Sequence, residues 1–245
     1  MTVTTLKRTE KVNPLDQIKP VNKLDEIKGL KVEDSDIKQV LRNYEEMLVY
    51  DPDKVGILGG DPDEQFDKFR TLNNIILSPD KISTFAKITV CYENHENFRI
   101  NTGLFISALI QNSYDSGNNN FYFKTNNIEW LGTYNKGNKE NPLVISIEEN
   151  HGTRIGEETE YSTFNIKENH GTEIGWDAKH STFNIEENQG ENIGWDAKHS
   201  TFKSSNEKTL DSIKAKPRRD NKFYLIKDGK EIPYKKILPK YGIGS

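Results

Sequence analysis

The feature that most constrains how this chain folds is a motif that recurs three times at an interval of 19 residues. The copies read ENHGTRIGEETEYSTFNIK, ENHGTEIGWDAKHSTFNIE and ENQGENIGWDAKHSTFKSS. The positions that keep one residue type throughout include Gly152, Gly171 and Gly190; Gly156, Gly175 and Gly194; Ser162, Ser181 and Ser200; Phe164, Phe183 and Phe202. Self-similarity at such a period is typical of stacked architectures, in which each repeat buries its apolar residues against its neighbours.

The composition permits a hydrophobic core, but a lean one. Hydrophobic residues make up 33% and charged residues 29% of the chain, a polar excess that fits a thin solenoid with a large surface. The formal net charge is only -4, so no strong field attracts nucleic acid or an anionic membrane. We therefore expect neither of these as a partner.

Cysteine usage and the absence of long apolar runs bear on location. Cys91 is the one cysteine of the sequence, which excludes an internal disulfide and a cysteine-rich metal site built by this chain alone. The first residues contain no apolar run suited to a secretion signal, and no later segment approaches the roughly 20 apolar residues of a membrane span. The expectation is a soluble, cytoplasmic protein without a cofactor.

Each repeat carries the alternation of a short β-strand. In the segment S-T-F-N-I, the Phe and Ile positions face inward, and the Ile-Gly pair of the other half adds a second inward aliphatic residue. Two short strands per repeat make a coil, and neighbouring coils stack about 4.8 Å apart. Equivalent residues are then predicted to form ladders: Phe164, Phe183 and Phe202; Ile166 and Ile185; Asn150, Asn169 and Asn188.

The pattern N-x-G-x-x-I-G-x-x-A-K-x-S-x-F-x-I resembles the GXGXG repeat found at the C-terminus of the large glutamate synthase subunit and in one of the subunits of formylmethanofuran dehydrogenase. In that family a G-N-x-G-x-x-V-G-x-x-M-x-x-G-x-I-x-V unit winds into a right-handed parallel β-helix. The matching positions are Asn169, Gly171, Ile174, Gly175, Ala178, Ser181, Phe183 and Ile185, and then Asn188, Gly190, Ile193, Gly194, Ala197, Ser200 and Phe202.

The chain departs from that family at two positions of each repeat. Serine stands where the family prefers glycine, at Ser162, Ser181 and Ser200, and glutamate precedes the asparagine where the family has another glycine, at Glu149, Glu168 and Glu187. The resemblance covers the repeat region alone. It implies a parallel β-helix with a structural and subunit-contacting role, and it implies no catalytic residue.

The sequence on both sides of the repeats predicts an α+β chain. Residues 1–29 are expected to form a flexible or docking arm, 30–124 a small mixed cap, 125–203 the solenoid, and 204–245 a basic linker with a β-hairpin tail. Within the cap, periodicity and helix-start signals predict helices over 35–49, 61–78 and 102–113, and strands over 81–93 and 121–124. In the tail, Asp228-Gly229 predicts a two-residue type I′ turn, and the hairpin is a candidate lid.

A pair of tryptophans is the strongest candidate for a contact surface. Trp176 and Trp195 occupy the same place in successive repeats, with Lys179 and Lys198 three residues later. Glu157 fills that place in the first repeat, which favours an outward orientation. We call Trp176, Trp195, Lys179 and Lys198 the tryptophan strip and interpret it as an interaction surface; the alternative is that the rings point inward and belong to the core.

Four of the five histidines also recur between repeats. His151 falls over His170, and His180 over His199, so that pairs of imidazoles are candidates to share a transition metal. Against this, duplication copies a surface histidine without selecting a site, and no further histidine or cysteine completes a set of four ligands. We therefore expect no metal.

No motif supports catalysis. GILGGDPDE lacks the Lys-Ser/Thr of a phosphate-binding loop, and the basic segment KAKPRR lacks the interleaved aromatic residues typical of nucleic-acid contact. We name no catalytic residue. The preferred hypothesis is a non-enzymatic interaction or assembly module that contacts a protein partner or itself. The alternatives are an accessory subunit of a multi-subunit oxidoreductase or amidotransferase, and an enzyme with its site between cap and solenoid.

Overall fold

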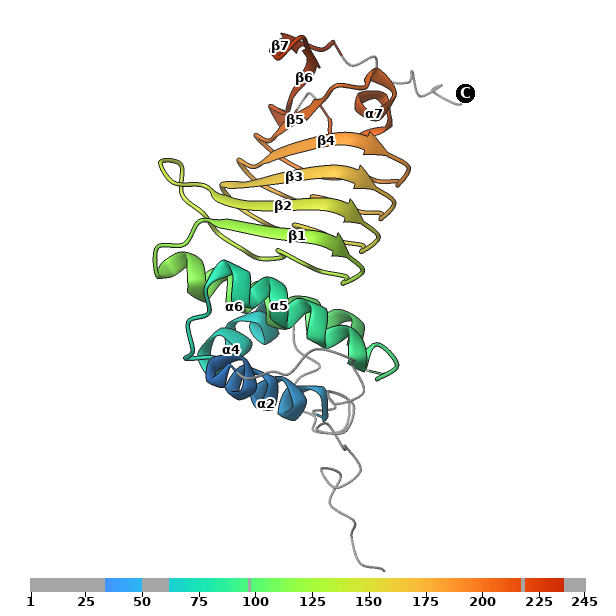
Figure 1. Cartoon of the computed structure of the whole chain (residues 1–245). Helices are drawn as coiled ribbons and strands as arrows, with labels where there is room; N and C mark the ends of the chain where they lie inside the picture. Colours follow the sequence, from blue (N-terminus) through green and yellow to red (C-terminus); the bar gives the residue numbers. More distant parts are fainter. Residues whose placement is uncertain (1–33, 50–61, 97, 217–218, 236–245) are drawn as a thin grey trace, which may run out of the picture.

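The computed structural model describes residues 34–49, 62–96, 98–216 and 219–235. Helices lie at the N-terminal end, a parallel β-solenoid follows, and an antiparallel hairpin ends the described chain (Figure 1). This arrangement confirms the α+β class expected from the sequence. The arm predicted over 1–29 lies outside the described residues.

The first helix, α2, spans Ser35–Val49 as predicted. The Asp34 carboxylate caps it by accepting hydrogen bonds from the backbone N–H groups of Asp36, at 2.9 Å, and Ile37, at 3.2 Å. The ammonium group of Lys81 lies 2.9 Å from Asp34 and 2.7 Å from Asp36. These ion pairs connect the start of α2 to Lys81 in a later helix of the cap, Pro79–Thr89.

The second helix, α4, spans Pro62–Leu72 and is shorter than predicted. Phe66 and Phe69 are buried as expected, but Leu72 is 54% and Ile76 56% exposed. The helix ends because Asn73 turns its side chain back to the chain, where Nδ2 donates to the carbonyl of Phe69 at 2.9 Å. An asparagine bonded to its own backbone in this way competes with helix continuation.

The strand predicted over 81–93 is wrong. Pro79–Thr89 forms helix α5 and Val90–Tyr92 a 3₁₀ turn, η2. The alternation from Ile88 to Tyr92 coexists with a helical face, since Ile82, Phe85, Ala86 and Thr89 are all buried. Pro79 at the first helical position is the start signal that decides between the two periods.

Helix α6, Phe98–Asp115, extends the helix predicted over 102–113 and closes the lower end of the solenoid. Its Ser107 hydroxyl donates to the carbonyl of Trp130 at 3.0 Å and accepts from the N–H of Gly132 at 2.8 Å. Asn135 Nδ2 donates to the Ser107 carbonyl at 2.8 Å. The first coil thus finds partners for its backbone on α6. In the described chain, no helix combines the length and apolarity needed to cross a lipid bilayer.

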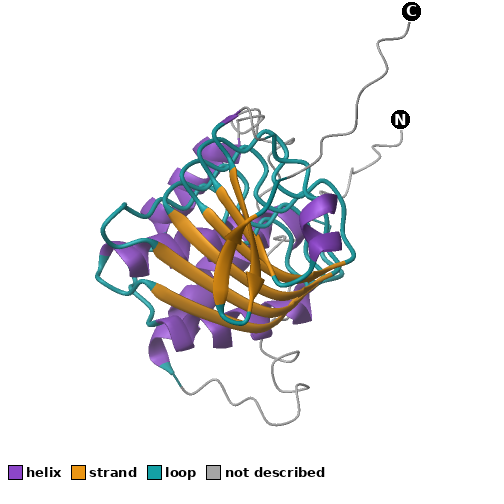
Figure 2. Cartoon of the chain, turned by 90° about the horizontal axis from the view of Figure 1, so that it is seen from above, coloured by secondary structure: helices purple, strands orange, loops and turns teal. Residues whose placement is uncertain are grey.

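The described strands form one seven-stranded sheet in sequence order. They are β1 Asn120–Asn126, β2 Leu143–Asn150, β3 Ser162–Asn169, β4 Thr182–Asn188, β5 Thr201–Ser204, β6 Lys222–Lys227 and β7 Lys230–Pro233. Strands β1 to β6 pair in parallel, so the strand expected in the cap is in fact the first rung of the solenoid sheet. Seen along the stack, strands occupy one side and loops complete the coils on the other (Figure 2).

The predicted ladders are confirmed. Phe164 and Phe183 stack with ring centroids 5.2 Å apart, Phe183 and Phe202 with centroids 5.4 Å apart, and all three are fully buried. At the corner of each coil, Asn150 Nδ2 donates to Asn169 Oδ1 at 2.8 Å. Asn126 below and Asn188 above extend this amide ladder. Like side chains from successive coils therefore lie on top of one another.

The segment predicted as a basic linker instead closes the upper end of the solenoid. Helix α7, Glu207–Ser212, lies within it, and Leu210, Ile213 and Ala215 are buried. Phe223 on β6 then stacks on Phe202 with centroids 5.7 Å apart. The phenylalanine ladder thus continues past the last recognisable repeat.

The C-terminal hairpin joins β6 to β7 through the turn predicted from the sequence. Asp228 and Gly229 both have positive φ, 51° and 70°, as a type I′ turn requires. Strand β7 is exposed along its length and pairs on one side with β6. Its Lys230 and Pro233 are residue types that discourage pairing with another chain at a sheet edge.

Candidate functional site

The tryptophan strip lies on the loop side of the solenoid. The rings of Trp176 and Trp195 stack with centroids 5.8 Å apart and planes 18° from parallel. Trp195 is 42% exposed and Trp176 is half-buried. The rings therefore face outward and form a continuous aromatic surface across two coils, although Glu157, the acidic residue from which this orientation was predicted, is itself buried.

Two further residues extend the strip downward. The guanidinium carbon of Arg154 lies 5.6 Å from the ring centroid of Trp176 and 4.8 Å from that of Trp130. An arginine between two tryptophans is a cation–π arrangement that holds both rings in place. We call Trp130, Arg154, Trp176 and Trp195 the Trp–Arg stack. Trp130 and Arg154 were not predicted from the sequence as part of this surface, because Arg154 occupies a different position of the repeat from Trp176.

The charges beside the Trp–Arg stack are paired within the chain. Glu173 Oε2 accepts from Arg154 Nε at 2.8 Å. The ammonium group of Lys198 lies 3.0 Å from Asp177 on the coil below, and the guanidinium of Arg219 lies 2.9 Å from Asp196. Lys179 is exposed beside them. The flanks of the stack are thus largely neutralised internally.

Glu157 lies beneath this surface and is buried, with 7% of its area exposed. Burial raises the pKa of its carboxyl to about 7, although the guanidinium of Arg154 acts in the opposite direction. Its Oε1 is 3.5 Å from Arg154 Nη1, whereas Oε2 is buried without a hydrogen-bond partner. A carboxyl in this setting keeps its proton to a higher pH than an ordinary glutamate does.

The histidines form two stacks at the edges of the coils. His151 and His170 stack with centroids 4.7 Å apart, and His151 Nε2 lies 2.9 Å from Glu149 Oε1. His180 stacks on Tyr161 on one side and on His199 on the other, with centroids 4.9 Å apart in both cases. The duplicated pairs expected from the sequence are thus in contact, but their surroundings differ.

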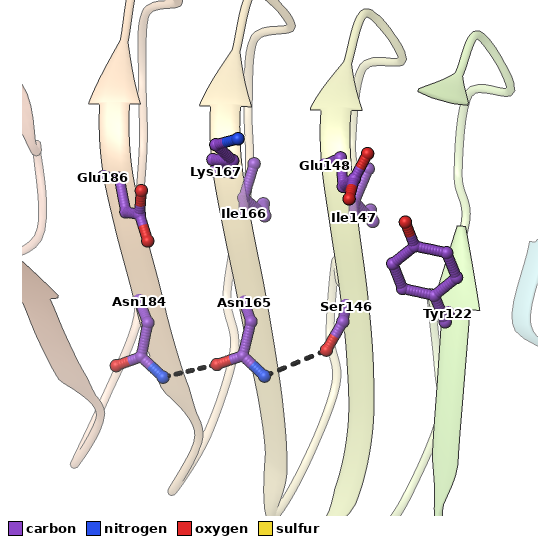
Figure 3. A pocket seen from close by; sticks show the side chains of 9 residues that line it. All are labelled: Tyr122, Ser146, Ile147, Glu148, Asn165, Ile166, Lys167, Asn184 and Glu186. Carbon is purple, nitrogen blue, oxygen red and sulfur yellow. Dashed lines mark hydrogen bonds between the residues drawn. The ribbon is translucent and has the colours of Figure 1, made fainter. Parts of the chain in front are cut away.

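The outer face of the sheet carries a shallow hollow of about 340 Å³ (Figure 3). Across its floor Asn184 Nδ2 donates to Asn165 Oδ1 at 2.7 Å, and Asn165 Nδ2 donates to Ser146 Oγ at 3.1 Å. Tyr122 stands at one end and is 50% exposed. In the sequence, Ser146, Asn165 and Asn184 each lie two residues before a charged residue of the same strand, at a position that faces outward. We did not interpret this row as functional.

The junction of cap and solenoid holds another hollow, of about 290 Å³, between α5 and β1. Its polar lining comes from Ser83, Lys87, Lys124, Asn126 and Asn127. Asn126 is already bonded in the amide ladder. The lining contains no carboxylate, histidine or cysteine, so this hollow provides no acid–base pair of its own.

Comparison with known proteins adds no relative: no family model matches the sequence, and no curated protein or solved structure matches the chain. The resemblance to the GXGXG repeat therefore stays a hypothesis drawn from the motif. Within the Trp–Arg stack, Trp195 at the upper end is 42% exposed, whereas Trp130 at the lower end is buried.

Proposed function

We propose that this chain is a non-enzymatic interaction module and that the Trp–Arg stack is its contact surface for a protein partner. The observation that carries the proposal is the exposure of Trp195 at the end of a preformed stack. An exposed tryptophan costs hydrophobic free energy in the free protein and is enriched at the energetic centres of interfaces. A partner that covers Trp195 recovers that free energy.

The surroundings of Trp195 favour such a role. Trp176 is fixed between Trp195 and Arg154, so little side-chain freedom remains to be lost on association. The flanking Asp177 and Asp196 are already paired with Lys198 and Arg219. Attraction to the partner is therefore expected to be aromatic and apolar, and its dependence on salt to be weak.

The GXGXG resemblance supports one specific form of this proposal. If this chain shares the subunit-contacting role of that family as well as its architecture, the partner is another subunit of a multi-subunit oxidoreductase or amidotransferase. The identity of the bound protein distinguishes this form from a general assembly module. Self-association through the same surface is the other form, and the molar mass in solution reveals it.

The test is affinity capture from the native cell with the full chain, compared with two variants. Trp195→Ala removes the exposed ring, and Tyr122→Ala is the matched control because it removes a similarly exposed aromatic ring from the sheet face. We expect a protein that the wild type and Tyr122→Ala capture and that Trp195→Ala loses. Size-exclusion chromatography with light scattering is run on the same three proteins.

Two outcomes decide the matter. A partner lost only with Trp195→Ala, or a dimer that dissociates only in that variant, supports the proposal. Capture that is identical for all three proteins, together with an unchanged monomeric mass, overturns it. Raising the salt concentration separates an aromatic contact, which persists, from an electrostatic one, which weakens.

A further inference from the structure

A cluster of three metal-ligating groups lies at one corner of the solenoid. Glu149, His151 and His170 each offer one ligand atom, and these atoms lie within 4.8 Å of one another. Among the described residues of the chain, this is the place where three such groups meet. The sequence argument against a metal counted only histidines and cysteines and left the carboxylate out.

The fold brings these residues together through its 19-residue period. His151 and His170 hold the same place in successive coils, so their rings lie one rung apart, with planes 7° from parallel. Glu149 lies at the end of β2, two residues before His151, and turns to the same corner. Gln189 takes the equivalent position in the third repeat, which limits the histidines at this corner to two.

From this geometry we propose that Glu149, His151 and His170 bind one divalent transition-metal ion such as Zn²⁺ or Ni²⁺. Imidazole nitrogens suit these ions, and a single carboxylate completes a three-ligand site that leaves at least one coordination position open. Harder ions such as Mg²⁺ and Ca²⁺ prefer an all-oxygen shell and are not accommodated.

The distances allow such an ion after a small side-chain movement. Two ligand atoms about 2.1 Å from one ion stand about 3.4 Å apart at the tetrahedral angle, and His151 Nε2 and Glu149 Oε1, now 2.9 Å apart, need to separate only slightly. The widest separation in the cluster, up to 4.8 Å, has to shorten. His170 has to tilt out of its stack, because the in-plane lone pairs of parallel rings do not converge.

The local charge favours a cation. Glu168 and Glu187 stand in register with Glu149 on β3 and β4, so the corner carries a column of carboxylates. Mutual repulsion within this column is relieved when a cation binds beside it. Without a metal, repulsion between these glutamates slightly destabilises the stacking of the coils. Binding of a cation removes this repulsion, so the metal-bound form is favoured.

The experiment is calorimetric titration of the full chain, without a polyhistidine tag, with Zn²⁺ and separately with Ni²⁺ and Mg²⁺. We expect one ion of Zn²⁺ or Ni²⁺ per chain and no heat from Mg²⁺. Loss of a group that only hydrogen-bonds to a metal ligand typically weakens metal binding about 10- to 100-fold. His170→Ala and Glu149→Gln, which remove direct ligands, should each weaken it by at least about tenfold.

The second histidine stack supplies the matched control. His180 and His199 are also stacked, at 4.9 Å, and His180→Ala should leave the titration unchanged. Circular dichroism of each variant without metal confirms that the fold is intact. Absence of Zn²⁺ binding by the wild type overturns the proposal, as does equal binding by His170→Ala. Loss of binding in His180→Ala assigns the ion to the other stack and overturns it too.

Discussion

Asn150 donates a hydrogen bond through its side-chain amide to Asn169 on the next coil, with 2.8 Å between Nδ2 and Oδ1. Asn169 in turn donates to Asn188 at 2.7 Å and to the carbonyl of Gly171 at 2.9 Å. Asn169 is 1% exposed. Replacing it by leucine keeps the volume and leaves several buried groups without partners. We expect Asn169→Leu to lower the free energy of unfolding by at least about 2 kcal/mol, measured by urea denaturation.

A matched control lies on the same strand. Asn165 belongs to the outer amide row of β3, bonded to Ser146 and Asn184, but it is half-buried and water can replace its partners. Asn165→Leu should cost less than about 1 kcal/mol. Equal losses for the two variants would mean that burial of the inner ladder adds nothing to stability.

Gly171 is required by the close approach of two coils. A Cβ at this position would lie 1.9 Å from the carbonyl oxygen of Gly152, a backbone atom that cannot rotate away. We expect Gly171→Ala to cost about 3 kcal/mol or more, the upper end of overpacking. Thermal unfolding monitored by circular dichroism measures it. Gly117→Ala is the comparison, because a Cβ there meets nothing within 4 Å and adds only backbone strain of about 1 to 2 kcal/mol.

Phe183 and Phe223 test how stability is distributed along the stack. Phe183 is fully buried with a phenylalanine ring on each side, 5.2 Å and 5.4 Å away, whereas Phe223 lies at the upper end of the stack, 5.7 Å from Phe202, and is 5% exposed. Phe183→Ala should cost about 3 to 5 kcal/mol in urea denaturation, and Phe223→Ala clearly less. A larger loss from Phe223→Ala would show that closing the upper end matters more than the interior of the stack.

The repeat made the solenoid predictable, because a fixed period sets the register of every rung. The phenylalanine and asparagine ladders, the outward tryptophans and the Asp228-Gly229 turn follow from it or from local turn chemistry. Outside the repeats that constraint is absent. Residues 81–93 satisfy both a strand and a helix pattern, and the helix start at Pro79 together with the buried face of α5 selects the helix.

The upper closure and the candidate sites were harder to predict for a different reason. Leu210 is buried in the core and belongs to α7, a helix that has no counterpart in the repeat. The repeat motif therefore does not predict its burial. Arg154 and Glu149 each contact residues at other positions of the repeat than their own. The 19-residue period predicts contacts between like positions, whereas the structure places Arg154 between two tryptophans and Glu149 beside His151.

Glu157 makes stability depend on pH in a direction opposite to that of most carboxylates. Its pKa is raised by burial to about 7, above the ordinary value of 4.5 expected in the unfolded chain. Between these values the unfolded chain has released the proton and the folded protein still holds it, so the free energy of unfolding falls as pH rises. The decrease attributable to this group is up to about 3 kcal/mol between pH 4.5 and 7.

Glu157→Gln removes the titration while keeping the shape of the side chain. Urea denaturation of both proteins at pH 4.5, 6 and 7.5 isolates the effect, since other titrating groups cancel in the difference. Relative to the wild type, the variant should gain stability steadily across this range and no further above pH 7.5. Glu158→Gln, at the exposed neighbouring position, should show only a small part of this trend, because burial raises the pKa of Glu157 more than the charge of Glu158 does. A wild-type minus variant difference that stays constant from pH 4.5 to 7.5 would mean that the Glu157 carboxyl titrates normally in the folded protein.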